Sequence, residues 1–264
     1  MKSVVATALF AGLALASPMM DRAKAKLEAR NLARRSGGFI NAKDGSRFTG
    51  NLTATTSEST NWAGAAIVTS GVTEIQGTFT IPKPSKPSGG SSSTSYCGAA
   101  WVGIDGYSDS DLIQTGVLWC VQGSSYEYEA WYEYLPASLV YYNGITVTNG
   151  ESVSVKCTKT GSNSGTTSLT AGGTTVTHTF SNQKSPIPGN SAEWIVEDFE
   201  EGSGLVPFAN FGTVTFTGAT AVINGATVSA SSDSPVNIEL ENSSGKVITA
   251  TTISGSTVTV KYTG

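Results

Sequence analysis

Carboxylate side chains gather in two segments of the sequence that also carry aromatic residues. In YEYEAWYEY, residues 126–134, the period of two along a β-strand places four side chains on one face, namely Glu127, Glu129, Trp131 and Glu133. Positioned carboxyl groups of this kind can act as general acid or general base. A solvated strand face is the commoner outcome of such a pattern, but the aromatic residues favour an extended substrate groove.

The second segment, AEWIVEDFEE at residues 192–201, alternates in the same way. One face of a strand would carry Glu193, Ile195, Glu197 and Phe199, and the other would carry Trp194, Val196, Asp198 and Glu200. The carboxylates of Glu193 and Glu197 would therefore point to the same side. This is a second candidate source of acid–base groups.

A glutamine adds a third candidate. If residues 97–105 and 112–120 form a hairpin, Gln114 lies opposite Gly103, on the face that carries Trp101, Asp105 and Gly116. A glutamine beside a tryptophan and two glycines leaves room for the close approach of a ligand backbone. An ordinary exposed glutamine is an equally good interpretation of this position from the residues alone.

The same register pairs Cys97 with Cys120, which makes them a candidate disulfide in an exported protein. Cys157 would remain unpaired, and its place in an alternating strand favours a buried apolar role over a nucleophilic one. The single histidine, His178, excludes a His-cluster metal site and lies mid-strand in TVTHTF, where a structural role is the better interpretation. The sequence contains no G-x-S-x-G, no D-T-G or D-S-G and no H-E-x-x-H motif.

The elements around these residues are short β-branched or aromatic runs separated by turn residues, from Asn61 onward. The pattern predicts an all-β fold of about a dozen strands, a two-sheet antiparallel β-sandwich of the concanavalin-like jelly-roll type. Asn143-Gly144, Asn149-Gly150 and Asn224-Gly225 are hairpin signals. Residues 82–95, rich in Pro, Ser and Gly, predict an exposed loop open to nicking.

Charge divides the 264 residues into two parts, with a net charge of +6 for residues 1–56 and −10 for residues 57–264. The basic start, the short apolar run and the A-x-A end of residues 1–16 predict a secretory signal peptide, too short to span a membrane. We interpret residues 17–56 as a basic propeptide with a dibasic processing site at Arg34-Arg35; a disordered N-terminal arm is the alternative. The acidic remainder, a single domain over residues 57–264, disfavours nucleic acid as a partner.

Six blocks carry a resemblance to a known family, in this order: STNWAGA (59–65), AAWVGIDG (99–106), LIQTG (112–116), YEAWYEY (128–134), AEWIVEDFEE (192–201) and VPFANF (206–211). Over residues 57–264 the chain resembles the glutamic peptidases, or eqolisins, which are secreted acid endopeptidases of filamentous fungi. The layout of signal peptide and basic propeptide is similar as well.

The resemblance implies a catalytic dyad formed by Gln114 and Glu197. It also implies a substrate groove that includes Trp62, Trp101, Asp105, Glu129, Trp131, Glu133 and Phe199. The sequence departs from the family pattern at Leu118, where an acidic residue is often found, and Glu129 takes a place sometimes held by Asp. These two positions bear on subsite preference and pH optimum.

The expected function is that of a secreted, pepstatin-insensitive acid endopeptidase. Glu197 would activate water, Gln114 would stabilise the oxyanion, and neither a metal nor a cofactor is required. The expected partners are protein or peptide substrates and the chain's own propeptide as an inhibitor, with no membrane partner and a monomeric state. A β-sandwich glycoside hydrolase and a lectin-like wall protein are the alternatives, although the E-x-D-x-x-E spacing of the former is absent.

Overall fold

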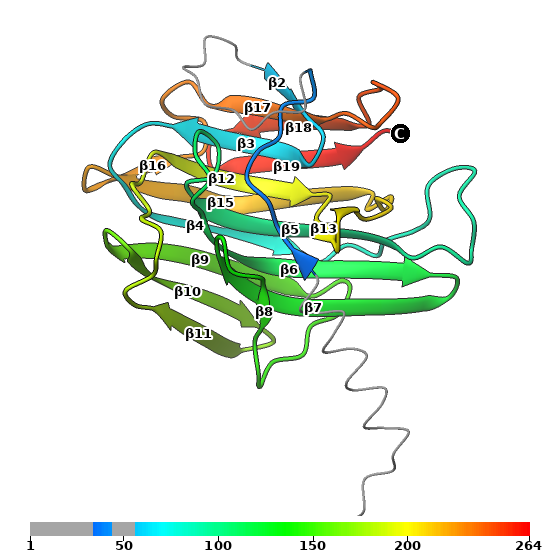
Figure 1. Cartoon of the computed structure of the whole chain (residues 1–264), viewed down its shortest axis with the longest axis horizontal. Coiled ribbons are helices and arrows are strands. Elements are labelled where there is room, and N and C mark those ends of the chain that lie inside the picture. Colours follow the sequence, from blue (N-terminus) through cyan, green and yellow to red (C-terminus); the bar gives the residue numbers. More distant parts are fainter. Residues whose placement is uncertain (1–33, 44–55) are drawn as a thin grey trace, which may run out of the picture.

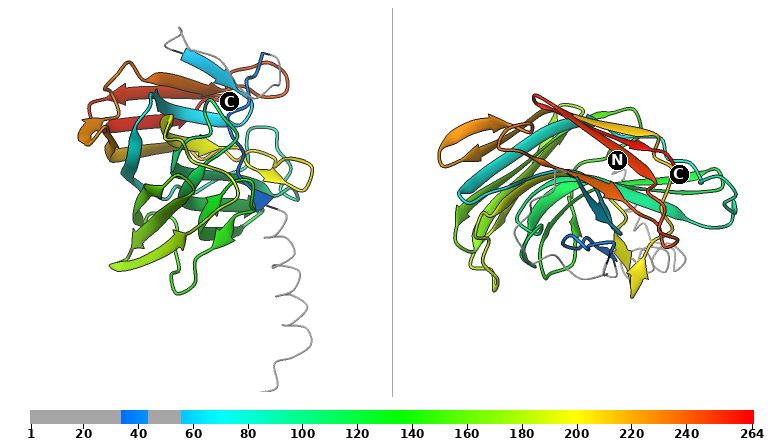
Figure 2. Two further views of the ribbon diagram at one scale, coloured as in Figure 1. Left: turned by 60° about the vertical axis from the view of Figure 1, so that its left-hand side comes forward. Right: turned by 90° about the horizontal axis from the view of Figure 1, so that it is seen from above.

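The computed structural model describes residues 34–43 and 56–264 as strands, turns and loops. These ranges contain no helix, and so none that could cross a membrane. Two sheets of eight strands lie face to face, as Figures 1 and 2 show, with a third sheet of three short strands at one side. The predicted all-β sandwich is confirmed.

The front sheet, which faces the viewer in Figure 1, has the order β2-β17-β3-β12-β5-β6-β7-β8. Its strands are β2 (Thr56–Ser59), β17 (Val236–Leu240), β3 (Trp62–Val68), β12 (Ser191–Glu197), β5 (Tyr96–Ile104), β6 (Ile113–Gln122), β7 (Ser125–Tyr134) and β8 (Val140–Tyr141). Neighbouring strands run antiparallel except β2 and β17, which are parallel.

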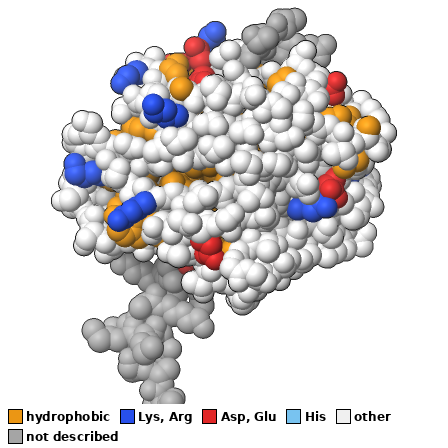
Figure 3. Space-filling view, turned by 180° about the vertical axis from the view of Figure 1, so that it is seen from behind, with side chains coloured by type: hydrophobic (Ala, Val, Ile, Leu, Met, Phe, Trp, Pro, Cys, Tyr) orange, Lys and Arg blue, Asp and Glu red, His pale blue; other side chains and the backbone are white. Residues whose placement is uncertain are grey.

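The back sheet has the order β11-β10-β9-β4-β15-β19-β18, with β16 paired to β15. Its strands are β11 (Thr174–Phe180), β10 (Ser164–Ala171), β9 (Ser152–Gly161), β4 (Val72–Thr80), β15 (Thr213–Ile223), β19 (Thr257–Tyr262), β18 (Thr249–Ser254) and β16 (Ala226–Ser229). Seen from behind in Figure 3, the molecule carries scattered charged side chains and several small hydrophobic patches.

Strand alternation gives the front sheet two different apolar faces. Trp194 and Val196 of β12 belong to the core between the sheets. Ile195 of the same strand belongs to a second cluster on the outer face, together with Trp101 and Trp131. Side chains at alternate positions of a strand point to opposite faces of the sheet. The alternation predicted for residues 192–201 is therefore confirmed as far as Glu197, where β12 ends.

The third sheet lies over the outer face of the front sheet and joins distant parts of the chain. Its strands are β1 (Arg34–Arg35), β13 (Glu200–Glu201) and β14 (Gly204–Leu205), in the order β1-β13-β14. From β1 the chain continues across the front sheet to Lys43, as Figures 1 and 2 show. We call residues 34–43 the N-terminal segment.

The predicted register of the β5–β6 hairpin is confirmed. Gly103 pairs with Gln114 and Cys97 with Cys120, and the two cysteines form a disulfide. Cys157 is free and buried in the core, as expected. His178 stacks on the ring of Tyr132 at 4.0 Å between ring centroids, which is a structural role.

Of the three Asn-Gly signals, only Asn224-Gly225 joins two strands of a hairpin, β15 and β16. The prediction was wrong for Asn143-Gly144, which follows β8, and for Asn149-Gly150, which precedes β9. Gly144 and Gly150 both have φ of 81°; Asn149-Gly150 forms a hydrogen-bonded turn, and Asn143-Gly144 is a bend. Local sequence specifies the turn conformation, whereas pairing of the flanking strands depends on the rest of the fold.

Candidate active site

Glu197, the last residue of β12, lies at the centre of a buried polar cluster on the outer face of the front sheet. Its side chain is fully buried. One carboxyl oxygen, Oε2, accepts a hydrogen bond from the indole Nε1 of Trp101 at 2.8 Å. The other, Oε1, accepts one from the backbone N–H of Gly37 at 2.9 Å. A buried carboxyl group with two fixed donors has a defined orientation.

Gln114 of β6 is fully buried in the same cluster. Its amide Nε2 donates to Glu133 Oε2 on the neighbouring strand β7 at 2.8 Å, and the two residues are directly opposite in the ladder. Glu133 Oε2 also accepts the backbone N–H of Ser36 at 3.2 Å. The side-chain amide of Gln114 is therefore held by a carboxyl group beneath it.

Ser36 joins these two parts of the cluster. Its hydroxyl hydrogen-bonds Glu197 Oε2 and lies 3.4 Å from Gln114 Oε1. The structure therefore brings Gln114 and Glu197, which are on strands β6 and β12, to one and the same oxygen atom. That atom belongs to the N-terminal segment.

Aromatic and amide side chains hold the rest of the N-terminal segment. Trp62 Nε1 donates to the carbonyl of Gly37 at 3.0 Å, and Asn61 Nδ2 donates to the carbonyl of Gly38 at 3.0 Å. The ring of Phe39 stacks on Tyr107 with 4.6 Å between centroids. These contacts fix three consecutive residues, Gly37, Gly38 and Phe39, as a peptide-binding groove does.

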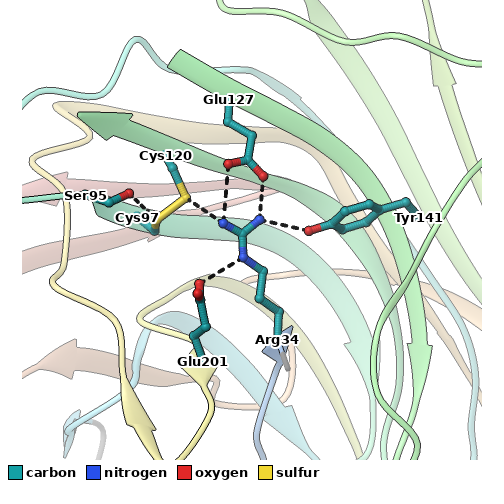
Figure 4. A network of polar contacts seen from close by, with 7 residues as sticks. All are labelled: Arg34, Ser95, Cys97, Cys120, Glu127, Tyr141 and Glu201. Atoms are coloured by element: carbon teal, nitrogen blue, oxygen red, sulfur yellow. Dashed lines mark hydrogen bonds and ion pairs between the residues drawn. A yellow bond between two sulfur atoms is a disulfide. The ribbon is translucent and has the colours of Figure 1, made fainter. Parts of the chain in front are cut away.

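Arg34 enters an acidic pocket at the other end of the segment (Figure 4). Its guanidinium group is fully buried and contacts Glu127 at 2.6 Å and Glu201 at 3.1 Å. It also donates to the hydroxyl of Tyr141 at 2.9 Å and lies 5.8 Å from the ring centroid of Phe199. Arg35, by contrast, is half exposed and pairs with Glu200 at 2.6 Å.

Burial changes the acidity of the cluster. It raises the pKa of Glu197 to about 8, although hydrogen bonds from Gly37 and Trp101 act in the opposite direction. Burial, together with the nearby Glu197 carboxyl group, raises the pKa of Glu133 well above its ordinary value. Ser36 and Gly37 of the N-terminal segment and Trp101 of the front sheet all contact this carboxyl group, and its burial disfavours the charged form.

The remaining predicted groove residues have several different surroundings. Trp131 and Phe199 line a small void beside Ser36, as Leu118 does. Glu129 is half buried, and burial followed by the nearby Glu127 raises its pKa. Asp105 accepts the backbone N–H groups of Gly189 and Asn190 and so holds a loop; burial raises its pKa to about 7.

The two glycines beside Gln114 do not leave room for a ligand. A Cβ atom at Gly116 would lie 2.1 Å from the carbonyl oxygen of Ala100 and 2.6 Å from Cβ of Trp101. A Cβ atom at Gly103 would lie 2.8 Å from Cζ3 of Trp101. Our interpretation of these glycines was wrong. They allow Trp101 to pack closely against the sheet, which positions its indole N–H on Glu197.

Sequence reasoning missed the direct involvement of Ser36 and Gly37, and also that of Asn61, Tyr141 and Glu201. Asn61 stands beside Trp62 in the STNWAGA block, which was a usable signal. Glu201 is the last residue of the AEWIVEDFEE block, which was a second signal. Ser36, Gly37 and Tyr141 have no local pattern that marks them. Within residues 34–43 and 56–264, no group of three or more His, Cys, Asp or Glu side chains could hold a metal ion.

Comparison with known proteins places this arrangement in a family. The Peptidase A4 family matches residues 60–262. Aspergillopepsin-2 of Aspergillus niger is 39% identical over 280 residues, covering 98% of both chains. Scytalidopepsin B of Scytalidium lignicola is 33% identical over 276 residues, covering 98% of this chain and 97% of its own.

Among solved structures, scytalido-glutamic peptidase with a transition state analog inhibitor has a TM-score of 0.69 and 34% identity. The match covers 77% of this chain and 98% of that one. The family match over residues 60–262 includes Trp101, Gln114 and Glu197. The chain therefore belongs to the Peptidase A4 family of glutamic endopeptidases, the eqolisins.

Proposed function

We propose that the chain is a secreted, acid-active endopeptidase that hydrolyses peptide bonds of proteins with Gln114 and Glu197, and that it is made as a zymogen. The observation that carries the proposal is the convergence of both side chains on the Ser36 hydroxyl. Two buried polar groups on separate strands that meet at one oxygen atom can hold a water molecule there once that atom departs. Peptide ligands are supported by the complex of scytalido-glutamic peptidase with a peptide-based transition state analog.

In the proposed reaction, ionised Glu197 takes a proton from a water molecule held between it and Gln114, and the water oxygen attacks the scissile carbonyl carbon. The amide N–H of Gln114 donates to the developing oxyanion, a contribution of roughly 3–4 kcal/mol where single donors have been removed. The C–N bond then breaks, and Glu197 returns the proton to the leaving amine. Trp101 keeps the carboxyl group of Glu197 oriented throughout.

For the ionised form to exist at acidic pH, Glu197 must lose the burial that raises its pKa to about 8. Removal of the N-terminal segment would admit water and bring this pKa towards its ordinary range. We therefore assign residues 17–56 to a propeptide that acts as the chain's own inhibitor, and residues 1–16 to a signal peptide. Most of both regions lies outside the described residues.

Two observations support this division. The full-length relatives match 98% of this chain, whereas the solved scytalido-glutamic structure is matched almost completely by 77% of it. In addition, the described part of the proposed propeptide occupies the cluster around Glu197, with Arg34 in an acidic pocket.

The test is digestion of casein or haemoglobin from pH 2 to 8 in the presence of pepstatin. Acid-treated wild-type protein is compared with Glu197→Gln and Gln114→Ala, and with Gln122→Ala as a matched control at the exposed end of the same strand β6. We expect acid activity in the wild type and in the control. Loss of one oxyanion donor predicts a decrease in kcat of about 100- to 1,000-fold for Gln114→Ala, and Glu197→Gln should be inactive.

Activity that persists in Glu197→Gln, or a Gln114→Ala variant that matches its control, would contradict the dyad. Sedimentation analysis of the same samples tests the proposed monomer. Membership of the peptidase family removes the glycoside hydrolase and the lectin-like protein as alternatives.

A further inference from the structure

We propose that the N-terminal segment inhibits the enzyme because the hydroxyl group of Ser36 takes the place of the attacking water. The inference rests on the proposed Gln114/Glu197 dyad and goes beyond it, since it names the atom that keeps a bound peptide from being cut. The N-terminal segment covers the dyad and fills the position of the co-reactant.

The hydroxyl group of Ser36 lies between the two side chains of the proposed dyad. It hydrogen-bonds Glu197 Oε2 and lies 3.4 Å from Gln114 Oε1. These are the two groups between which the proposed mechanism holds its water. A hydroxyl oxygen can form the same hydrogen bonds as water. Because it is bonded to Cβ of Ser36, it cannot be transferred to a carbonyl carbon as water is.

There is little free volume around Ser36 for a water molecule. The residue is 3% exposed. The void beside it measures only about 10 Å³, and its lining is mostly apolar, with Ala99, Leu118 and Trp131. A water molecule needs at least this volume together with several polar partners. The void therefore offers no second position for the nucleophile.

The proposed oxyanion donor, the amide of Gln114, is bound to Glu133 while the N-terminal segment is in place. Its Nε2 donates to Glu133 Oε2, and the same carboxyl oxygen accepts the backbone N–H of Ser36. The carbonyl groups of Gly37 and Gly38 are instead bound by Trp62 and Asn61. The N-terminal segment is thus held by its carbonyls at side chains other than the proposed oxyanion donor.

Anchors on both sides keep Ser36 in this register. Arg34 is fixed in its acidic pocket two residues before Ser36, and the ring of Phe39 is stacked on Tyr107 three residues after it. With both ends fixed, the side chain of Ser36 is confined to the space above Glu197. Removing only its hydroxyl group would leave a vacancy of about the size of a water, lined by two polar groups.

The experiment measures, by mass spectrometry, how fast the full-length chain is cleaved within residues 34–43 after transfer to acid. It compares the wild type with Ser36→Ala, Ser36→Gly and the control Lys43→Ala. Lys43 belongs to the same segment, but its side chain is 79% exposed. We expect both Ser36 variants to cut their own residues 34–43 about two- to tenfold faster than wild type, the effect of removing one hydrogen bond to a carboxyl group that is uncharged in acid. Lys43→Ala should convert at the wild-type rate.

A second measurement needs no variant proenzyme to fold. Synthetic peptides of residues 34–43, with Ser36 or with Ala in its place, are added to acid-processed wild-type enzyme that is assayed on a separate reporter peptide. The Ser36 peptide should inhibit and remain largely intact, and the Ala peptide should be turned over, with a higher kcat. An Ala peptide that stays intact overturns the inference, whatever its affinity.

The inference and the proposed function fail in different ways. If the reporter is cut in a manner that requires Gln114 and Glu197, but Ser36→Ala does not accelerate cleavage of the N-terminal segment, the role of Ser36 is wrong and the dyad stands. If reporter cleavage does not require the dyad, the proposed function is wrong, and the inference falls with it.

Discussion

The buried guanidinium of Arg34 offers the sharpest test of how the N-terminal segment is held. Truncation to alanine removes contacts with Glu127 at 2.6 Å, Glu201 at 3.1 Å and the Tyr141 hydroxyl at 2.9 Å. A hydrogen bond to a charged group contributes about 1.5–3 kcal/mol. Because Glu127 is 22% exposed and Glu201 30% exposed, solvent screens both pairs. We therefore expect a total loss of about 2–3 kcal/mol in the binding of the segment.

That loss corresponds to a rise of about 30- to 150-fold in the fraction of open proenzyme. The assay is the activity of unprocessed protein on a reporter peptide, measured before any cleavage is detected. Arg35→Ala is the matched control, because this neighbouring arginine is 52% exposed and makes one surface ion pair, worth about 0–1 kcal/mol. Arg34→Lys should lie between wild type and alanine, because a lysine lacks the planar fork.

Equal activities of Arg34→Ala and Arg35→Ala would refute the reasoning, since they would show that burial of the guanidinium does not matter. So would an Arg34→Ala variant whose activity before processing equals that of the unprocessed wild type.

Two further predictions concern stability, and both are best measured in the Glu197→Gln background to prevent self-digestion. Burial raises the pKa of Asp105 to about 7, whereas an unfolded Asp titrates near ~3.9, so the contribution of Asp105 to stability is largest below pH ~4 and is lost as the pH rises to about 7. Calorimetry should therefore give a lower Tm at pH 8 than at pH 4, and the Tm of Asp105→Asn should depend less on pH. An equal or higher Tm at pH 8 would count against this. Gly116→Ala should cost about 1–3 kcal/mol or more in urea unfolding because its Cβ would collide with Ala100 and Trp101, whereas Gly204→Ala, which meets nothing within 4 Å, should leave the midpoint nearly unchanged.

Much of the front sheet could be predicted because it is locally encoded. The β5–β6 register places Gln114 opposite Gly103, and the same register brings Cys97 opposite Cys120. Strand alternation also predicts that Glu133 and Glu127 share a face of β7, and both contact the N-terminal segment. These relations need only the period of a strand and one hairpin turn.

The position of the N-terminal segment could not be predicted in this way. Its positive charge implies attraction to an acidic domain, but charge alone does not select a register. The partners of Arg34 come from positions 93 and 167 residues away, on β7 and β13. Nor could the raised pKa of Glu197 be predicted, since its largest cause is burial, which depends on how distant parts of the chain pack around the carboxyl group.

Under the N-terminal segment the pKa of Glu197 is about 8, and contact with water would lower it, so the covered state binds the extra proton and is favoured at Glu197 as the pH falls. Protonation of Glu197 therefore opposes the release of the N-terminal segment in acid, and the release has to come from its other contacts or from cleavage of the segment itself. Glu197 would become an effective base only after water has reached it and its pKa has fallen.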